Sequence, residues 1–277
     1  MQDTLNQLYS KVGLPNQQLN AGLYVTATPI GNLADITLRA LYLLSKADLI
    51  LCEDTRVTNK LLQSYGIKNE LLSYNDHSNQ GKRNIVVERI AAGQIIALVS
   101  DAGTPLISDP GYKLVRQVID AKQTVYTIPG ANAAVAALAC AGLPTDKFIF
   151  AGFTDKHSEL ERLLSYNLPV IIYEAPTRVA KLLKRLPDNC NIVIARELTK
   201  LHEQILRGTP AEVLAGLEHQ KGEFVVIIQQ DKVQISDELL RNELNELLKT
   251  HRLKAASQIL ADKYGVSKKY VYGLGVG

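Results

Sequence analysis

The stretch QIIALVSDAGTPLISDPG, Gln94–Gly111, joins an apolar run over 94–100 to a twelve-residue loop over Ser100–Gly111 that is dense in Gly, Pro, Ser and Asp. A short apolar run bounded by turn residues is typical of a buried strand. The loop is longer than a simple turn requires, so it exposes backbone N–H and C=O groups on which a ligand could bind. Asp101 could accept hydrogen bonds from a ribose or an amine. The stretch predicts a strand of an α/β sheet with a ligand-binding loop at its carboxyl end.

Strand-like and helical patterns alternate around this stretch. We expect strands at 23–28, 48–53, 94–100 and 123–128, separated by helices at 35–47, 55–65 and 79–92, the first of them capped by Asp35. This order predicts a mostly parallel sheet with helices on both faces. After a small-residue helix at 132–141, further strands are expected at 147–151, 169–174, 190–196, 204–207 and 223–230. Their short connections, such as Gly208–Pro210, predict a mixed sheet.

Beyond residue 230 the pattern is helical only. Helices at 237–250 and 253–264, then a short one starting at 267 or 268, predict a helix-turn-helix-like appendage. The sequence therefore predicts an N-terminal tail over 1–20, a first α/β domain over 21–130, a second over 131–232 and a helical segment over 233–277.

Composition narrows the class of protein. The chain has 277 residues, 46% of them hydrophobic and 21% charged, which excludes a disordered or fibrous protein. No apolar run approaches the roughly 20 residues that cross a bilayer, and the N-terminus lacks a secretory pattern, so we expect no membrane association and a cytoplasmic location. Three distant cysteines are expected to be reduced, buried thiols, and the five histidines lack ligand spacing, so no bound metal is predicted.

The charge is unevenly distributed. The net charge is +3, and residues 251–277 carry five basic side chains against Asp262, a net of +4, which leaves −1 for residues 1–250. We expect any polyanionic partner to meet the C-terminal end.

Two more loops follow expected strands. Thr28–Asn32 follows the first strand, and Gly130–Ala134 has side chains small enough to let a ligand approach the backbone. Neither is a Walker loop or a G-x-G-x-x-G fingerprint. Because ligands bind at the carboxyl ends of strands in open α/β sheets, the three loops together predict a binding site. A further strand ends in Glu53–Arg56, where Asp54 could cap a helix, act chemically, or do both.

Several strings resemble the family of bacterial small-subunit ribosomal RNA methyltransferases I, within the tetrapyrrole methylase superfamily. They are T-P-I-G-N-L-A-D-I-T from Thr28, E-D-T-R-V-T from Glu53, S-D-A-G-T-P-L-I-S-D-P-G from Ser100, I-P-G-A-N-A-A from Ile128, A-R-E-L-T-K from Ala195 and K-G-E-F from Lys221. The resemblance runs from about Gly22 to the end. This sequence departs from the family pattern in the loop Thr154–Glu159, which in relatives tends to be longer and more basic.

The resemblance implies two α/β domains with S-adenosylmethionine in the cleft between them, a homodimer, and 2′-O-methylation of a cytidine in small-subunit (16S) ribosomal RNA. The cofactor-binding residues that it implies are Thr28, Pro29, Ile30, Gly31, Asn32, Asp101, Ala102, Gly103, Thr104, Pro105, Gly130, Ala131, Asn132, Ala133, Ala134, Tyr173, Glu174, Gly222, Glu223 and Phe224.

A ribose hydroxyl needs a proton acceptor within hydrogen-bond reach to become a nucleophile. The catalytic candidates are Glu53, Asp54, Arg56, Asp76, His77 and Glu197. The candidates for contact with RNA are Arg196, Lys200, Arg252, Lys254, Lys263, Lys268 and Lys269, since guanidinium and ammonium groups bind phosphates. The base is left open, and Arg196–Glu197 could instead be a local ion pair.

Two other functions remain open. The same fold could methylate a tetrapyrrole, another small acceptor or a modified histidine, but the basic C-terminal end would then have no role. The second of these functions is that of a DNA-binding regulator with an α/β sensor domain, although the segment Ser267–Tyr272 is short for a recognition helix.

Overall fold

The structure is a computed structural model, and it describes residues 2–16, 18–75, 80–154, 157–218, 221–230 and 236–276. The chain forms two compact units, residues 1–230 and residues 231–277, which are described separately.

The first sheet of the large unit is parallel throughout. Its strands are β1 (Gly22–Thr26), β2 (Leu49–Cys52), β3 (Leu71–Ser73), β4 (Ile95–Leu98) and β5 (Val125–Ile128), in the order β3-β2-β4-β1-β5. The expected parallel α/β arrangement is confirmed. Strands β4, β1 and β5 are adjacent in this order, and because all the strands are parallel, the loops that follow them meet at one edge of the sheet.

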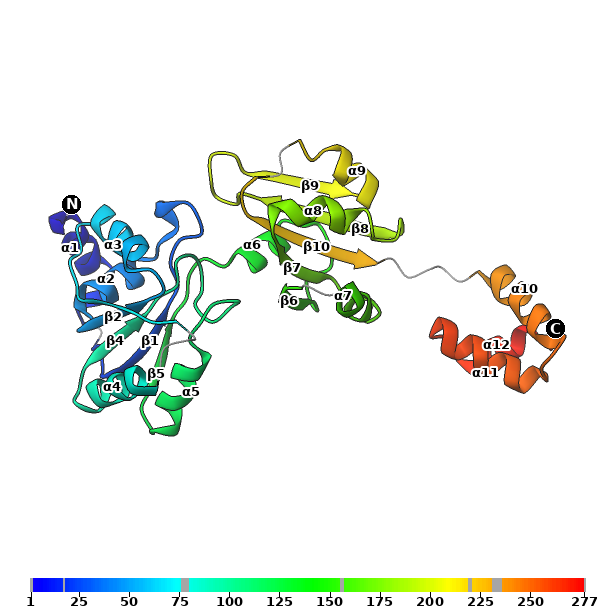
Figure 1. The fold of residues 1–277 in the computed structure, drawn as a ribbon, viewed down its shortest axis with the longest axis horizontal. Helices are drawn as coiled ribbons and strands as arrows, with labels where there is room; N and C mark the ends of the chain where they lie inside the picture. Colours follow the sequence, from blue (N-terminus) through cyan, green and yellow to red (C-terminus); the bar gives the residue numbers. More distant parts are fainter. Residues whose placement is uncertain are drawn as a thin grey trace. The chain divides into compact units, whose positions relative to one another are not determined.

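Helices cover both faces of this sheet (Figure 1). One face packs against α1 (Gln2–Lys11), the 3₁₀ turn η1 (Leu14–Asn16), α2 (Leu38–Lys46) and α3 (Thr55–Ser64), and the other against α4 (Gln80–Ala91) and α5 (Tyr112–Asp120). The strands alternate accordingly: Ile50 and Cys52 join the first core, while Leu49 and Leu51 join the second.

Three local features differ from the sequence-based expectation. The N-terminal residues form α1, whose Leu5 and Tyr9 are buried in the core, rather than a tail. A 3₁₀ turn, η2 (Leu33–Asp35), precedes α2, so the helix is capped by Thr37, which accepts from the Ala40 N–H, and not by Asp35. The edge strand β3 was not expected, because it is only three half-buried residues long.

The second sheet is mixed, as expected. Its strands are β6 (Ile149–Phe153), β7 (Val170–Glu174), β8 (Cys190–Arg196), β9 (Gln204–Gly208) and β10 (Phe224–Gln230), in the order β6-β7-β10-β8-β9. Only β6 and β7 are parallel; the other neighbouring strands are antiparallel. The register of β6 against β7 shifts between Phe150 and Gly152, which is the signature of a β-bulge.

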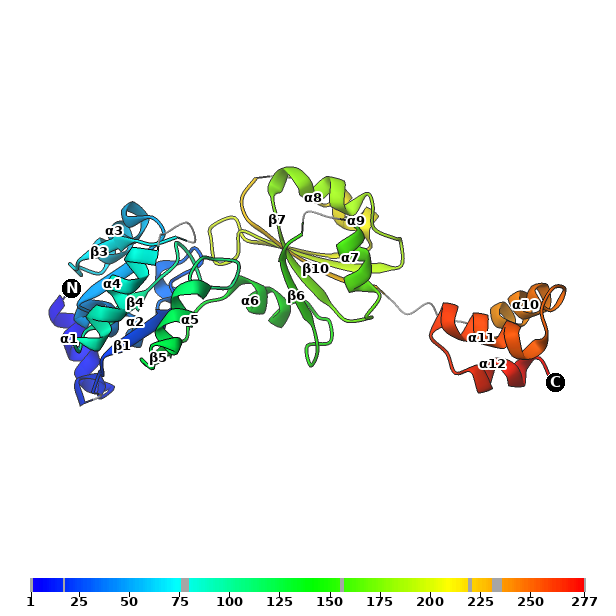
Figure 2. The same cartoon turned by 60° about the horizontal axis from the view of Figure 1, so that its bottom comes forward.

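Helix α6 (Ala133–Ala139) packs on one face of the second sheet, and α7 (His157–Leu164), α8 (Pro176–Leu183) and α9 (Pro210–Ala215) pack on the other (Figure 2). The small side chains of Ala134 and Ala137 let α6 lie close to Ile171 and Val193. Helix α6 follows the loop after β5, so its N-terminus brings that loop to the second sheet.

The C-terminal unit is a bundle of α10 (Asp237–Leu248), α11 (Leu253–Tyr264) and α12 (Lys268–Leu274). Leu240, Leu244, Leu260 and Val271 form its core. Ser236 and Ser267 cap α10 and α12, and Gly265 ends α11 in the left-handed conformation.

Among the described residues, no helix is long and apolar enough to span a bilayer. Cys52 and Cys190 are buried thiols, as expected, whereas Cys140 is only half-buried.

Candidate functional site

The loops after β1 and β4 are joined by main-chain hydrogen bonds. The Thr28 N–H donates to the Gly103 carbonyl at 2.8 Å, and the Gly103 N–H donates back to the Thr28 carbonyl at 3.2 Å. Gly103 has φ = 79°, where a side chain is strained, and an added Cβ would lie 3.2 Å from Ile30 Cγ2. A side chain at position 103 would therefore hinder the close approach of the loops after β1 and β4.

The loop after β5 joins the same edge. The Thr104 hydroxyl donates to the Ala131 carbonyl at 3.0 Å, and the Asn132 side chain caps α6 by accepting from the Val135 N–H. A Cβ on Gly130 would lie 2.9 Å from the Cβ of Ala27. All three loops expected from the sequence thus meet, and each is fixed by contacts with its neighbours or with its own helix.

The loop after β4 is strained where it faces the second sheet. Leu106 and Ser108 have φ values of 72° and 66°, which non-glycine residues rarely adopt. A Cβ added to Gly152, in the bulge of β6, would lie 2.8 Å from Ser108 Oγ. Such strain persists only where the surroundings impose it, and it is common at functional sites.

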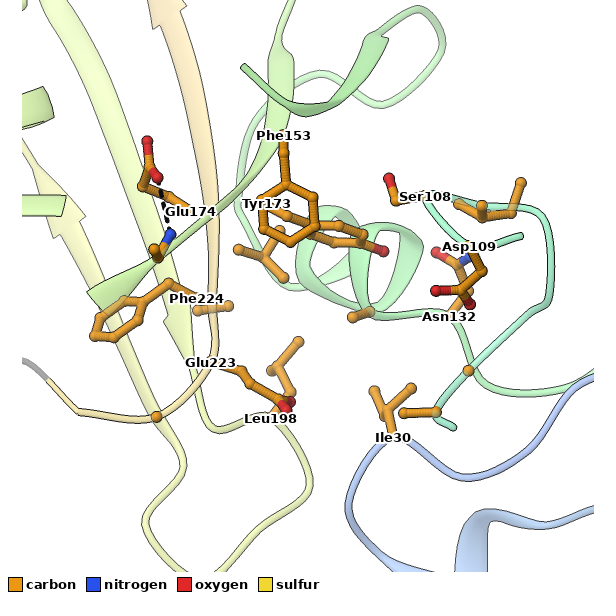
Figure 3. A pocket seen from close by; sticks show the side chains of 18 of the residues that line it. Ile30, Ser108, Asp109, Asn132, Phe153, Tyr173, Glu174, Leu198, Glu223 and Phe224 are labelled. Carbon is orange, nitrogen blue, oxygen red and sulfur yellow. Dashed lines mark hydrogen bonds between the residues drawn. The ribbon is translucent and has the colours of Figure 1, made fainter. Parts of the chain in front are cut away.

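A cavity of about 380 Å³ lies between these loops and the second sheet (Figure 3). Its size is within the range of small-molecule sites, roughly 300–1,000 Å³. It is lined by Ile30, Ala102, Gly103, Thr104, Ile107, Ser108, Asp109, Asn132, Ala133, Phe153, Tyr173, Glu174, Ala175, Pro176, Ala195, Leu198, Gly222, Glu223, Phe224 and Val225.

The lining includes eleven of the residues implied as cofactor-binding: Ile30, Ala102, Gly103, Thr104, Asn132, Ala133, Tyr173, Glu174, Gly222, Glu223 and Phe224. The others, which are Thr28, Pro29, Gly31, Asn32, Asp101, Pro105, Gly130, Ala131 and Ala134, lie in the same loops but do not line it. Sequence reasoning missed Ser108 and Asp109, although they fall inside the loop that it singled out. It also missed Phe153 and Leu198, for which no local motif exists.

The second sheet supplies aromatic rings and carboxylates. Phe153 and Tyr173 contact each other edge to face, with ring centroids 5.6 Å apart. Glu174 is buried and accepts from Arg178 Nε at 2.6 Å, which neutralises its charge. Burial raises the pKa of the Tyr173 hydroxyl, so the hydroxyl is neutral.

The turn before β10 is tied to the loop after β8. Glu197 Oε1 accepts from the Glu223 N–H at 2.9 Å and from Lys200 Nζ at 2.8 Å, and Lys200 Nζ also contacts Glu223 at 3.1 Å. The hydrogen bond from Lys200 lowers the pKa of Glu197. The local ion pair of Glu197 is with Lys200 and not with Arg196.

Arg196 supports the turn before β10. Its side chain is buried and donates to the Lys221 carbonyl at 2.7 Å.

Asp54 has both a capping and an ionic contact. It caps α3 by accepting from the Arg56 N–H at 2.8 Å, and it pairs with the Arg56 guanidinium at 2.6 Å. Hydrogen bonds from Arg56 lower its pKa from 3.8 to about 2, which makes it a weak proton acceptor. Asp101 Oδ1 accepts from the Asp54 N–H at 3.1 Å, so Asp101 ties the loop after β4 to that after β2.

None of the catalytic candidates that the structure describes lines the cavity. Glu53 is exposed at the end of β2, and neither it nor Asp54, Arg56 or Glu197 lines the cavity. Asp76 and His77 fall outside the described residues. Among the residues that the structure describes, no cluster of three metal-ligating side chains occurs.

The basic residues of the C-terminal unit that were expected to contact RNA lie in three different settings. Lys263 pairs with Glu243 at 2.7 Å and lies over the Tyr264 ring, so its charge is partly satisfied within the bundle. Lys254, Lys268 and Lys269 instead line one shallow depression together with Tyr272. Arg252 is exposed at the start of α11.

Comparison with known proteins first identifies the enzyme class to which the chain belongs. Residues 22–214 match the model of the tetrapyrrole (corrin/porphyrin) methylases, so the chain belongs to this family of methyltransferases. Solved structures agree on the fold: uroporphyrin-III C-methyltransferase from Thermus thermophilus superimposes with a TM-score of 0.52 at 17% identity, covering 76% of this chain and 94% of that one. Cobalt precorrin-4 methyltransferase gives a TM-score of 0.55 at 18% identity, covering 74% and 93%.

Curated relatives narrow the family further. The ribosomal RNA small subunit methyltransferase I of Synechocystis sp. is 42% identical over 268 residues, covering 91% of this chain and 96% of the relative. The proteins of that name from Pasteurella multocida and Escherichia coli O157:H7 are also 42% identical, covering 92% and 96%, and 90% and 93%, respectively. The chain belongs to the ribosomal RNA small subunit methyltransferase I family and is a methyltransferase enzyme.

Proposed function

We propose that this protein transfers a methyl group from S-adenosylmethionine to the ribose 2′-hydroxyl of a cytidine in small-subunit ribosomal RNA. The observation that carries the proposal is the cavity, since loops fixed by Thr28, Gly103 and Thr104 meet the second sheet around a space of about 380 Å³. The relatives' shared name supplies the class of acceptor.

The residues present fit S-adenosylmethionine. The glycine at position 103 keeps the loop backbone accessible, and the neighbouring wall carries the aromatic rings of Phe153 and Tyr173. The carboxyl group of Glu223 matches a cofactor that carries cationic and hydroxyl groups. When bound, the cofactor supplies an electrophilic methyl group on a sulfonium.

Methyl transfer is an in-line displacement, so the protein mainly has to align the acceptor and exclude water. Ile30, Leu198 and Phe153 supply an apolar lining, which disfavours bulk water next to the bound methyl group. The fixed loops hold the cofactor-binding groups in place before the acceptor arrives, which reduces the ordering cost of binding.

The basic depression of the C-terminal unit supports RNA as the acceptor. Lys254, Lys268 and Lys269 can contact phosphates, and the exposed ring of Tyr272 can stack on an unpaired base. A small-molecule methyltransferase would have no use for this surface.

We also propose that the large unit divides into two domains, over residues 21–130 and 131–232. We further propose that the enzyme works as a homodimer and that its ribosomal substrate places it in the cytoplasm.

The test compares acceptors. Purified protein is incubated with methyl-labelled S-adenosylmethionine and with assembled small subunits, naked small-subunit RNA or a tetrapyrrole. We expect label in ribosomal RNA and none in the tetrapyrrole. Transfer to the tetrapyrrole alone would contradict the proposal, and binding to operator-like DNA without transfer would favour a regulator.

A further inference from the structure

The cavity wall carries three carboxyl groups, and two of them already have ionic partners. Glu174 pairs with Arg178, and Glu223 pairs with Lys200 while its side chain is 76% exposed. Asp109 differs, because among the described residues it has no Lys or Arg partner within ion-pair distance, and it is half-buried. It is therefore the carboxylate of this wall most available to a substrate.

Asp109 is held in a fixed position. It follows Ser108, whose left-handed backbone lies against Gly152 in the bulge of β6, and it precedes the N-terminus of α5 at Gly111 and Tyr112. Figure 3 shows the Asp109 carboxyl on the loop side of the cavity, with the Tyr173 hydroxyl directed toward that loop. A group fixed by strained backbone on one side and a helix on the other satisfies the geometric demand on a proton acceptor.

We propose that Asp109 takes the proton from the acceptor hydroxyl during methyl transfer. The inference rests on the proposed function and assigns the base that sequence analysis left open. The acceptor oxygen forms a bond to the methyl carbon, and the carbon–sulfur bond breaks with its electron pair going to sulfur. The hydroxyl proton passes to the Asp109 carboxylate and later leaves to solvent.

The surroundings favour Asp109 over the earlier candidates that the structure describes. Burial raises the pKa of Asp109 above its usual 3.8, the Ser100 hydroxyl opposes this by hydrogen bonding, and the charge of Asp101 adds to it. A higher pKa makes an ionised carboxylate a better proton acceptor. Asp54 and Glu197, by contrast, have lowered pKa values and lie off the cavity wall.

The titration of Asp109 depends on few neighbours. Asp101 lies in its own loop, Tyr173 faces it from β7, and Glu174 and Glu223 line the same cavity. The rate of transfer should therefore fall at acidic pH with an apparent pKa above 3.8, as Asp109 becomes protonated.

The test uses Asp109→Asn in the full-length protein, with Asp120→Asn as the matched control, because Asp120 is an exposed residue that pairs with Arg116 at the end of α5. Binding of S-adenosylmethionine is measured by calorimetry, and single-turnover transfer to small subunits is measured from pH 4 to 9. For Asp109→Asn we expect a cofactor Kd within about threefold of wild type, a transfer rate lower by roughly 100-fold or more, and no acidic limb. Asp120→Asn should behave as wild type.

Two outcomes contradict the assignment while leaving the proposed function intact. If Asp109→Asn transfers at the wild-type rate, Asp109 is not the base. If cofactor affinity falls as much as the rate, Asp109 is a cofactor ligand instead. Failure of the wild type to methylate RNA would overturn the proposed function itself.

A second variant keeps the test decisive if Asp109→Asn does not fold. Asp109→Glu retains the carboxylate but moves it by one methylene. We expect a reduced rate with the acidic limb preserved and displaced in pH. A pH profile identical to that of wild type in Asp109→Glu would contradict the proposal.

Discussion

The backbone N–H of Asn32 donates to the hydroxyl of Thr199 across 3.1 Å, joining the loop after β1 of the first sheet to the loop after β8 of the second. Next to these residues, Ile30 and Leu198 both line the cavity. Thr199 has φ = 66°, so this loop is also strained. The contact holds together two loops that border the cavity from opposite sheets.

Removing this hydrogen bond should weaken cofactor binding. A neutral hydrogen bond contributes about 0.5–1.5 kcal/mol, so Thr199→Val should raise the Kd for S-adenosylmethionine by roughly 2- to 10-fold. Titration calorimetry measures this directly. An unchanged Kd would show that the contact is not linked to the cavity.

Close approach of the same loops should make Gly31 intolerant of a side chain. A Cβ on Gly31 would lie 2.5 Å from Lys200 Cγ, so Gly31→Ala should force the loops apart and weaken cofactor binding more than Thr199→Val does. Gly273→Ala is the matched control, since nothing lies within 4 Å of its added Cβ. Equal affinity in Gly31→Ala and Gly273→Ala would contradict the expectation.

Gly103 should not tolerate a branched side chain. Gly103→Val places a branched side chain at φ = 79° and against Ile30, so we expect loss of measurable cofactor binding in a protein that remains folded. Calorimetry and circular dichroism together separate binding from folding. Asp101→Ala should have a smaller effect, because Asp101 supports the loop through Asp54 but does not line the cavity.

The Asp54–Arg56 pair should make part of the folding stability depend on pH. The folded pKa of Asp54 is lowered from 3.8 to about 2, so its stabilising contribution is present above pH 4 and is lost as the pH falls toward 2. The difference in Tm between wild type and Asp54→Asn should therefore shrink over this interval. A difference that stays constant from pH 5 to pH 2 would rule out this contribution.

Lysines of the C-terminal depression should control the salt dependence of RNA binding. Replacing Lys254, Lys268 and Lys269 by Gln should weaken RNA binding and reduce the slope of log K against log salt by about 0.7 per lost phosphate contact. Lys249→Gln is the control, because Lys249 already pairs with Glu246. Equal slopes in wild type and the triple variant would mean that these lysines do not contact RNA, while cofactor binding should be unchanged in either case.

The order of strands and loops could be predicted from the sequence because apolar runs and Gly/Pro-rich loops are local sequence signals. The bounds of β8 and α11 agree with those expected, whereas β3 lacked a signal because an edge strand of three half-buried residues has no distinct period. Thr37 displaced Asp35 as a cap because the intervening 3₁₀ turn has no clear sequence signature.

The site was predictable in its loops but not in its chemistry. The pattern over Ser100–Gly111 predicted a ligand-binding loop, and part of that loop lines the cavity, but the pattern could not show that Asp109 rather than Asp101 lines it. That choice depends on the left-handed backbone at Leu106 and Ser108 and on the bulge at Gly152, which are set by packing between the two sheets. Similarly, Arg196 gave no local sign that it would be buried.

The most direct test of the proposed function identifies the methylated atom. Small subunits are labelled by wild-type protein with methyl-labelled S-adenosylmethionine, the RNA is digested to nucleosides, and the label is located by chromatography and mass spectrometry. We predict that it is found in 2′-O-methylcytidine. Label on a nucleobase, on a ribosomal protein, or only on a tetrapyrrole acceptor would contradict the account.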